Sequence, residues 1–253
     1  MRPLKPQMRL DIFLCERGYA QSRTEAKNFI VSGNVRVGGK TVTKPAFDVS
    51  EDESDVSVDS SSKRYVSRGG LKLEAALAAF KMDVTDRYAI DIGASSGGFT
   101  DCLLKSGAAH VIAVDSGSGQ MVESLRSDPR VTVIENYNAR YMKAEDFEYR
   151  PTLAVMDVSF ISATYIMPAI AEVLVDGGDF VCLIKPQFEV GRSGLGKGGI
   201  VKNDKIRRAA VDRVVDFAGS VGLIPKGIIT SPIEGGDGNT EFLAHFINGK
   251  TEK

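Results

Sequence analysis

Two charged residues follow directly on apolar runs of the kind that form buried strands. Asp157 comes after residues 153–156, and Lys185 comes after residues 180–184. An aspartate in this position is either a helix cap or a site residue, whereas a lysine caps nothing at a strand end. Pro186 fixes the backbone direction directly after Lys185. The pattern therefore predicts a functional lysine and, near it, a functional aspartate.

Glu241 and Lys72 are further candidates for the same site. Glu241 opens the last apolar strand pattern, after the glycine-rich loop 233–240, and is expected to point toward the same cleft. Lys72 lies in the first turn of a helix expected over 71–80, where a positive charge is unfavourable because that end of a helix is itself positive. Either a functional partner or solvent compensates this charge.

A glycine-rich turn lies between an apolar run and a helical pattern. Asp91 is followed by Gly93, Gly97 and Gly98, and such a strand–turn–helix arrangement brings backbone N–H groups close to a nucleotide-like ligand. No Gly-Lys-Ser/Thr follows, and the glycine spacing differs from the dinucleotide fingerprint. Asp115 closes the next apolar run, where a carboxylate can bind both hydroxyls of a ribose.

Two acids without a phosphate-binding sequence favour S-adenosylmethionine, which has a ribose, an adenine and an amino-acid tail but no phosphate. A tight glycine turn in some other α/β protein is the alternative. The cofactor-binding residues that we expect are Asp91, Gly93, Ser95, Gly97, Gly98, Phe99, Asp115, Asn138 and Asp157.

The segments from residue 88 onward alternate between strand and helix patterns. We expect strands at 88–92, 110–114, 131–134, 152–156, 179–184, 226–230 and 241–247, and helices at about 98–106, 118–127, 162–175 and 203–221. The last strand follows its neighbour by a short connection, so a parallel sheet with one antiparallel strand is expected. Ligands bind such sheets at the carboxyl ends of the strands, where the candidate residues fall.

The first 47 residues carry a positive balance. They contain nine Lys or Arg and three Asp or Glu, a balance of +6, whereas residues 48–59 contain six acids and no base. Helical patterns at 8–14 and 22–33 precede a hairpin that turns at 38–39. A compact basic module of this kind predicts binding to nucleic acid, and a solvated basic face is the alternative.

This module resembles the RNA-binding domain first seen in ribosomal protein S4. The resemblance rests on Arg9-Leu-Asp-x-x-Leu14 and on Ser22-Arg-x-x-Ala26-x-x-x-Ile30-x-x-Gly33-x-Val35-x-Val37-x-Gly39. It implies binding of structured RNA by shape and backbone contacts, chiefly through the two helices. The RNA-binding residues expected are Arg9, Arg17, Ser22, Arg23, Lys27, Arg36 and Lys40.

The order lysine, aspartate, lysine, glutamate matches the catalytic tetrad of FtsJ-type (RrmJ-like) ribose 2′-O-methyltransferases, and it assigns catalytic roles to Lys72, Asp157, Lys185 and Glu241. The motif Asp91-Ile-Gly-Ala-Ser-Ser-Gly-Gly-Phe also resembles theirs, with Ser96 in place of the usual proline. Almost the whole chain is similar to the haemolysin A (TlyA-type) family of rRNA 2′-O-methyltransferases. The runs that carry this similarity are Ser67-Arg-Gly-Gly-Leu-Lys-Leu, Asp157-Val-Ser-Phe-Ile-Ser, Lys185-Pro-Gln-Phe-Glu and Ser231-Pro-Ile-x-Gly-x-x-Gly-Asn-x-Glu241.

The resemblance implies a Rossmann-like class I S-adenosylmethionine-dependent methyltransferase fold behind a small α+β RNA-binding domain. The expected division is 1–60 for the S4-type domain, 61–67 for the linker and 68–253 for the methyltransferase domain. The implied substrate is a cytidine ribose in rRNA of the large subunit, and in some members also of the small subunit, so the expected partners are ribosomal RNA or ribosomal subunits. Residues 63–66 are implied as a connector that influences cofactor binding.

In that tetrad, Lys185 has apolar neighbours and a second lysine, Lys72, nearby. Both features lower the pKa of an ammonium group and would fit Lys185 to take the proton of the 2′-OH. Asp157 and Glu241 would hold the lysines and the hydroxyl in place, but as opposite charges they raise lysine pKa values. Whether Lys185 removes the proton or only orients the oxygen is open at this point.

Composition restricts the other possibilities. The 253 residues are 43% hydrophobic and 26% charged, and no apolar stretch approaches the roughly 18 residues of a membrane span. No signal peptide is expected, and three widely spaced cysteines favour a reducing cytoplasm. The two histidines, His110 and His245, lie too far apart for metal-ligand spacing, so no metal is expected.

Three rival functions fit the sequence less well. A binding protein without catalysis would need a broken tetrad. A base methyltransferase would want an Asn-Pro-Pro-Tyr or cysteine-nucleophile motif, and neither is present. A haemolysin-like cytolytic or membrane-active protein without methyl transfer is the alternative that the family name suggests, but no amphipathic or membrane-spanning segment supports it.

Overall fold

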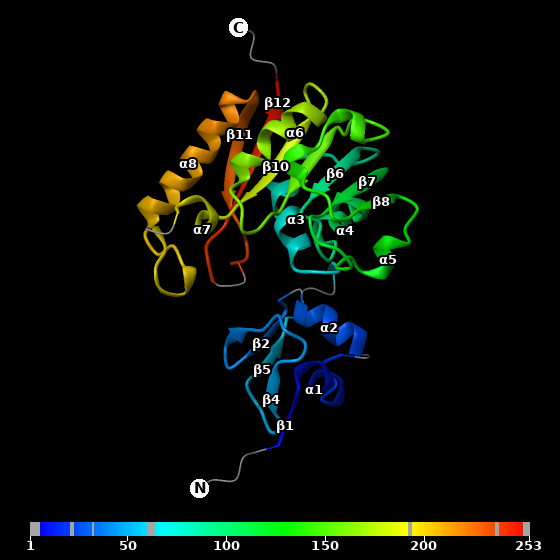
Figure 1. Cartoon of the computed structure of the whole chain (residues 1–253), viewed down its shortest axis with the longest axis vertical. Coiled ribbons are helices and arrows are strands. Elements are labelled where there is room, and N and C mark those ends of the chain that lie inside the picture. Colours follow the sequence, from blue (N-terminus) through cyan, green and yellow to red (C-terminus); the bar gives the residue numbers. More distant parts are fainter. Residues whose placement is uncertain are drawn as a thin grey trace. The chain divides into compact units, whose positions relative to one another are not determined.

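The computed structural model describes residues 6–20, 23–31, 33–59, 64–191, 194–235 and 238–249. The chain divides into two compact units, Met1–Arg68 and Gly69–Lys253, and Figure 1 labels most of their helices and strands. Each unit is described by itself.

The N-terminal unit packs two short helices against small sheets. Its elements are β1 (Gln7–Arg9), α1 (Leu10–Glu16), α2 (Arg23–Val31), β2 (Val35–Val37), β3 (Lys40–Thr41), β4 (Asp48–Ser50) and β5 (Val56–Val58). Strand β2 lies between β3 and β5, and β1 pairs with β4. Leu10, Phe13, Ile30 and Val35 are fully or almost fully buried in its core, so the apolar faces of both helices meet the sheet.

The expected helix over 8–14 is only partly correct. Residues 7–9 form a strand, in which Met8 pairs with Val49, and the helix begins at Leu10 and continues to Glu16. Helical spacing could not reveal this pairing, because β4 lies far along the chain. The turn at 38–39 between β2 and β3 is confirmed.

The C-terminal unit contains a seven-stranded sheet in the order β11-β12-β10-β9-β6-β7-β8. The strands are β6 (Tyr88–Ile92), β7 (His110–Val114), β8 (Val131–Ile134), β9 (Leu153–Met156), β10 (Asp179–Ile184), β11 (Leu223–Thr230) and β12 (Phe242–Asn248). Strand β12 is antiparallel to both of its neighbours, and the others run parallel. The predicted sheet, with one antiparallel strand, is therefore confirmed.

Helices cover both faces of this sheet (Figure 1). They are α3 (Gly69–Ala79), α4 (Gly98–Lys105), α5 (Glu123–Arg126), α6 (Met167–Val173), α7 (Pro186–Glu189) and α8 (Asp204–Ser220). On one face, Ile170 of α6 and Val214 of α8 are buried in one cluster with Ile92 and Phe180. Because strand side chains alternate between faces, Asp91 points to the other face, where α3 and α4 pack.

Two expected helices are shorter than their sequence patterns. The segment 118–127 is helical only at Glu123–Arg126, because Gly119 has a left-handed φ of 68° that a helix does not accept. The segment 162–175 divides into a 3-10 turn, Ala163–Tyr165, and α6. Pro168 explains the division, since proline fits the first turn of a helix but not its interior.

Candidate active site

The register of the sheet brings the charged candidates to one edge. Lys185 follows β10 and Glu241 precedes β12, and Ile184 lies opposite Phe242 in the antiparallel pair. Lys185 and Glu241 are therefore neighbours across the two strands. Asp157 follows β9, the parallel neighbour of β10 on its other side.

The four predicted catalytic residues form two ion pairs. Lys72 Nζ lies 2.5 Å from Glu241 Oε2, and Lys185 Nζ lies 2.6 Å from Asp157 Oδ1. Lys72 is 6% exposed and Glu241 is 2% exposed, so the first pair is buried. Lys185 Nζ also donates a hydrogen bond of 2.8 Å to Ser159 Oγ. The unfavourable charge of Lys72 at the start of α3 is therefore compensated by a partner, Glu241, and not by solvent.

The protonation of Lys185 differs from the sequence-based expectation. Burial lowers the pKa of this ammonium group, but the charges of Asp157 and Glu241 and the hydrogen bond to Asp157 outweigh burial, and the pKa is raised. The expectation of a lowered pKa was therefore wrong. In this arrangement Lys185 is a charged hydrogen-bond donor. It also links the two ion pairs, because its charge interacts with the carboxylates of both Asp157 and Glu241.

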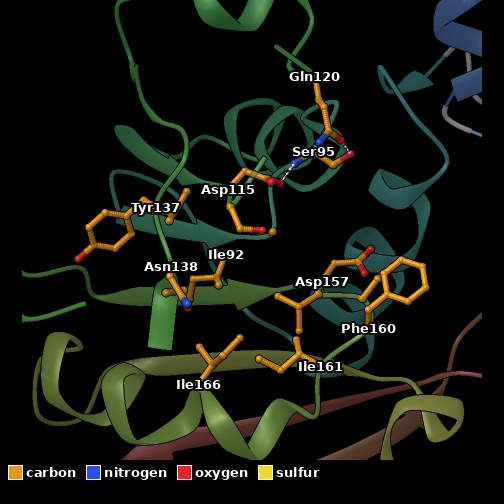
Figure 2. Close-up of a pocket in the computed structure, with 16 residues that line it drawn as sticks. Ile92, Ser95, Asp115, Gln120, Tyr137, Asn138, Asp157, Phe160, Ile161 and Ile166 are labelled. Carbon is orange, nitrogen blue, oxygen red and sulfur yellow. Dashed lines mark hydrogen bonds between the residues drawn. The ribbon is translucent and has the colours of Figure 1, made fainter. Parts of the chain in front are cut away.

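A pocket of about 340 Å³ opens at the ends of the parallel strands, and Asp157 of the second ion pair lines it (Figure 2). Five predicted cofactor-binding residues line it, namely Gly93, Ser95, Asp115, Asn138 and Asp157. Asp91, Gly97, Gly98 and Phe99 do not line it. Gly97 is the N-cap of α4, Gly98 and Phe99 are its first two residues, and Asp91 accepts a hydrogen bond from Thr100 of the same helix.

Asp115 is held firmly at the wall of the pocket. Its Oδ2 accepts a hydrogen bond of 2.8 Å from the Ser95 N–H, and its Oδ1 accepts one of 2.7 Å from the Gly117 N–H. The Ser95 hydroxyl donates in turn to Gln120 Oε1 at 3.0 Å. Figure 2 shows Asp115, Ser95 and Gln120 along one side of the pocket. A carboxylate oxygen has two lone pairs, so Asp115 can still accept from two hydroxyl groups.

The floor of the pocket is made by the turn after β6. The Cβ of any other residue at Gly93 would lie 2.4 Å from the backbone oxygen of Asp157, and Gly93 has a φ of 82°. Only glycine therefore allows these two strand ends to approach so closely.

Asp91, behind this turn, is fully buried and accepts a hydrogen bond of 2.6 Å from the Thr100 hydroxyl. Its Oδ1 has no hydrogen-bond partner within the part of the chain that the structure describes. Burial raises the pKa of Asp91 to about 7.

These features fit S-adenosylmethionine. The volume lies in the range of small-molecule pockets, about 300–1,000 Å³. In the described part of the chain, a fixed carboxylate is present for the ribose, a buried acid with one unpartnered oxygen lies behind the turn, and the lining residues include no lysine or arginine for a phosphate.

The comparisons with known proteins agree with this geometry. The profile of FtsJ-like methyltransferases matches residues 65–247, and that of the S4 domain matches residues 8–55. The chain belongs to the FtsJ-like methyltransferase family. The FtsJ-like match covers the pocket and all four charged residues, and the S4 match covers the basic module.

Two relatives are similar in sequence to this protein over most of its chain. The 16S/23S rRNA (cytidine-2′-O)-methyltransferase TlyA of Mycobacterium tuberculosis is 44% identical over 93% of this chain and 88% of its own length. Hemolysin A of Brachyspira hyodysenteriae is 44% identical over 95% of this chain and 100% of its own length.

Solved structures support the fold. A protein from Streptococcus thermophilus described as a hemolysin has a TM-score of 0.77 and 45% identity, over 98% of this chain and 90% of that one. An S-adenosylmethionine-dependent methyltransferase from Mesorhizobium loti has a TM-score of 0.52 at 14% identity, over 68% of this chain and 96% of that one. The class I methyltransferase fold is thereby confirmed, and this fold and family imply the use of S-adenosylmethionine.

Sequence reasoning missed the aromatic edge of the FtsJ-like site. Phe160 lines the pocket, is 92% exposed and has a φ of 65°, and its ring lies 5.2 Å from that of Phe188 between centroids. Beside it, the Arg140 guanidinium lies 4.9 Å from the centre of the Tyr165 ring. An open cavity of about 690 Å³ runs along these residues. The sequence could have indicated Phe160, because it lies within the run 157–162 that carries the family resemblance.

Other residues that line the 340 Å³ pocket were also missed. Among them, Gln120, Tyr137, Ile161 and Ile166 line it, as Figure 2 shows. They come from loops and helix ends whose positions depend on tertiary packing, so no local pattern marks them.

In the S4 domain, two predicted RNA-binding arginines share one buried acid. Arg9 donates to both oxygens of Asp11, at 2.9 and 3.0 Å, and Arg23 donates to Asp11 Oδ2 at 3.1 Å. The hydrogen bond from Arg9 outweighs burial and, together with Arg23, lowers the pKa of Asp11 to about 2. The two side chains are 44% and 57% exposed, and Asp11 fixes the direction of their guanidinium groups.

The other predicted RNA-binding residues are distributed over the same unit. Arg17 donates to the backbone oxygen of Glu51 and lies over the Phe13 ring. Lys27, Arg36 and Lys40 are exposed. Ser22 lies outside the described residues. Across the described part of the chain, no helix is long and apolar enough to cross a membrane.

Proposed function

We propose that this protein transfers a methyl group from S-adenosylmethionine to the ribose 2′-OH of a cytidine in ribosomal RNA. The observation that carries the proposal is the two ion pairs, Lys72–Glu241 and Lys185–Asp157, of which Asp157 lines the pocket. The names of the relatives support the substrate, since TlyA of M. tuberculosis is named for both 16S and 23S rRNA and TlyA of Campylobacter jejuni for 23S rRNA. Large-subunit rRNA is the proposed target, with small-subunit rRNA as an additional one.

S-adenosylmethionine would supply a methyl group on a positively charged sulfur. We assign Asp115 to its ribose, because this carboxylate is already oriented by two backbone N–H groups. Gly93 and Ser95 would provide the close backbone approach, and Asn138 and Asp157 would line the remaining walls. Asp91, Gly97, Gly98 and Phe99 would shape the turn and the start of α4 rather than contact the ligand.

Lys185 would act on the attacking oxygen as a charged donor. An ammonium group has three N–H bonds, of which one serves Asp157 and one Ser159, so the third can be donated to the 2′-oxygen. That oxygen gains negative charge as its proton passes to solvent water, and a fixed positive charge stabilises this change. The raised pKa of Lys185 favours this role over that of a base. Asp157 would hold Lys185 in position, while Lys72 and Glu241 would fix the adjoining strand end.

Two surfaces would hold the RNA. The exposed ring of Phe160 and the Arg140–Tyr165 pair offer stacking faces at the mouth of the pocket, and unpaired bases bind to such faces. We propose the boundaries 1–60 for the S4 domain, 61–67 for the linker and 68–253 for the methyltransferase domain. Arg9, Arg23 and the other basic residues of the S4 domain would bind the phosphate backbone of the RNA. With ribosomal RNA as substrate, the place of action is the cytoplasm.

A map of 2′-O-methyl groups in ribosomal RNA tests the proposal. Cells that produce the protein should carry a methylated cytidine ribose that is absent from cells without the gene and from cells with Lys185→Ala. An identical map in all three strains would refute rRNA as the substrate. Lysis of erythrocytes by the purified Lys185→Ala protein would favour the cytolytic alternative instead.

A further inference from the structure

Glu189 joins two loops of the methyltransferase unit through its side chain. It is the last residue of α7, and its Oε2 accepts a hydrogen bond of 2.6 Å from the Ser162 hydroxyl. Its Oε1 accepts one of 2.9 Å from the Ala163 N–H. Ser162 begins the 3-10 turn after β9, and its oxygen also accepts from the Thr164 N–H. Both carboxylate oxygens are thus used to hold the start of this turn.

The two joined segments carry the chemical groups of the site. Residues 157–163 bear Asp157, Ser159 and Phe160, and residues 185–189 begin with Lys185. At one end, Lys185 binds Asp157 and Ser159, and at the other end Glu189 binds Ser162 and Ala163. The loop after β9 is therefore tied to α7 at both ends.

Phe160 lies between these two ties, in a conformation that needs support. Its φ of 65° is in the left-handed region, which is unfavourable for a bulky residue. Its side chain is 92% exposed, and Phe188 of α7 is its ring neighbour. Such a conformation persists only where the surrounding bonds fix it, and the bonds of Glu189 lie two and three residues away.

We propose that Glu189 is a positioning residue that keeps the 157–163 loop in the geometry required for methyl transfer. The inference rests on the proposed function. Arg213 of α8 donates to the backbone oxygen of Glu189 at 3.0 Å, so the end of α7 is anchored independently of the side chain. Loss of the carboxylate should therefore release the loop and leave α7 in place.

Three variants test this role in the full-length protein. Glu189→Ala removes both acceptors, and Glu189→Gln keeps one acceptor for Ala163 and offers a donor to the Ser162 oxygen. Glu172→Ala, at an exposed position of α6, is the matched control. We expect kcat for rRNA methylation to fall roughly 10- to 100-fold in Glu189→Ala, as for a displaced site loop. Recovery in Glu189→Gln should be partial, and the control should match the parent.

Binding measurements separate positioning from contact. Affinities for S-adenosylmethionine and for rRNA should fall by a smaller factor than kcat in Glu189→Ala, because Asp157 and Phe160 stay on the released loop and the loss is chiefly one of orientation. An unchanged kcat would overturn the proposal. A loss of rRNA affinity that accounts for the whole loss of activity would also overturn it, since Glu189 would then contact RNA directly.

A fluorescent reporter follows the loop without any methyl transfer. The chain contains no tryptophan, so Phe160→Trp places a single one on the loop. Adding Glu189→Ala to Phe160→Trp should lower the emission anisotropy and increase quenching by acrylamide, whereas adding Glu172→Ala should change neither. Adding Ser162→Ala should give an intermediate anisotropy, because it removes one of the two hydrogen bonds to Glu189. This variant tests the proposal if Glu189→Ala folds poorly. Unchanged anisotropy in a folded Glu189→Ala variant would refute the positioning role, whatever the substrate of the enzyme proves to be.

Discussion

The buried ion pair between Lys72 and Glu241 should make Glu241→Ala one of the most destabilising changes in the methyltransferase unit. Glu241 Oε2 lies 2.5 Å from Lys72 Nζ, and both side chains are almost inaccessible to water. Removing the carboxylate leaves an ammonium group buried beside a small void. Breaking a buried pair in this way costs about 3–5 kcal/mol, out of a total stability of about 5–15 kcal/mol.

The assay is thermal and urea unfolding of the full-length protein, followed in the transition of the methyltransferase unit. Since 1 kcal/mol shifts Tm by about 2–4 °C in a domain of this size, Glu241→Ala should lower Tm by roughly 6–20 °C. The control is Glu145→Ala, whose 3.6 Å ion pair with Lys143 is exposed on both sides and should contribute within about 0.5 kcal/mol.

A double variant separates the charge from the packing. Lys72→Met combined with Glu241→Leu removes both charges while keeping side-chain volume, and it should recover much of the stability without recovering activity, since replacing a buried pair by apolar groups is often neutral or stabilising. If Glu241→Ala were no more destabilising than Glu145→Ala, the pair would not be buried as described, and the reasoning would fail.

Other predictions concern the cofactor, the RNA and pH. Asp115→Ala should weaken S-adenosylmethionine binding in calorimetry by about 1.5–3 kcal/mol, since it removes hydrogen bonds to a charged group; parent-like affinity would exclude Asp115 from the ribose site. Replacing Arg9, Arg23 and Lys27 by glutamine should reduce the salt slope of rRNA binding by about one unit for each phosphate that is no longer neutralised, and an unchanged slope would move the RNA surface elsewhere. The pKa of Asp91 is raised from 3.8 to about 7 by burial, so the stability linked to its proton is fully present below pH 4 and is lost as pH rises through 7. Asp91→Asn should abolish this decline in urea unfolding at pH 5 to 8, and a decline that persists would contradict the assignment.

The sequence was sufficient to predict a candidate site residue wherever a charged residue directly adjoins a buried strand. Asp157, Lys185 and Glu241 could be found because each adjoins an apolar strand, and parallel packing with one antiparallel strand brings these ends together. Lys72 could be suspected from its unfavourable place at the start of α3. Family resemblance supplied its role, and the structure supplied its partner.

What the sequence could not predict depends on contacts between distant segments. The pKa of Lys185 is raised by two carboxylates that reach it from neighbouring strands, whereas its local surroundings are apolar and suggested the opposite. The exposure of Phe160 depends on the hydrogen bonds that hold its loop to Lys185 and Glu189, and no local pattern indicates it. The pairing of Met8 with Val49 likewise converts part of an apparent helix into a strand.

The most direct test of the central claim is methylation of ribosomal subunits by the purified protein with S-adenosylmethionine labelled in its methyl group. We predict that the label enters ribosomal RNA on the 2′-oxygen of a cytidine and makes that linkage resistant to alkali. Lys185→Ala and Lys185→Arg should both fail to transfer the label while still binding RNA and cofactor, because a guanidinium group is planar and cannot replace the compact ammonium donor. Label on a nucleobase, or near-normal turnover by Lys185→Ala, would contradict the account.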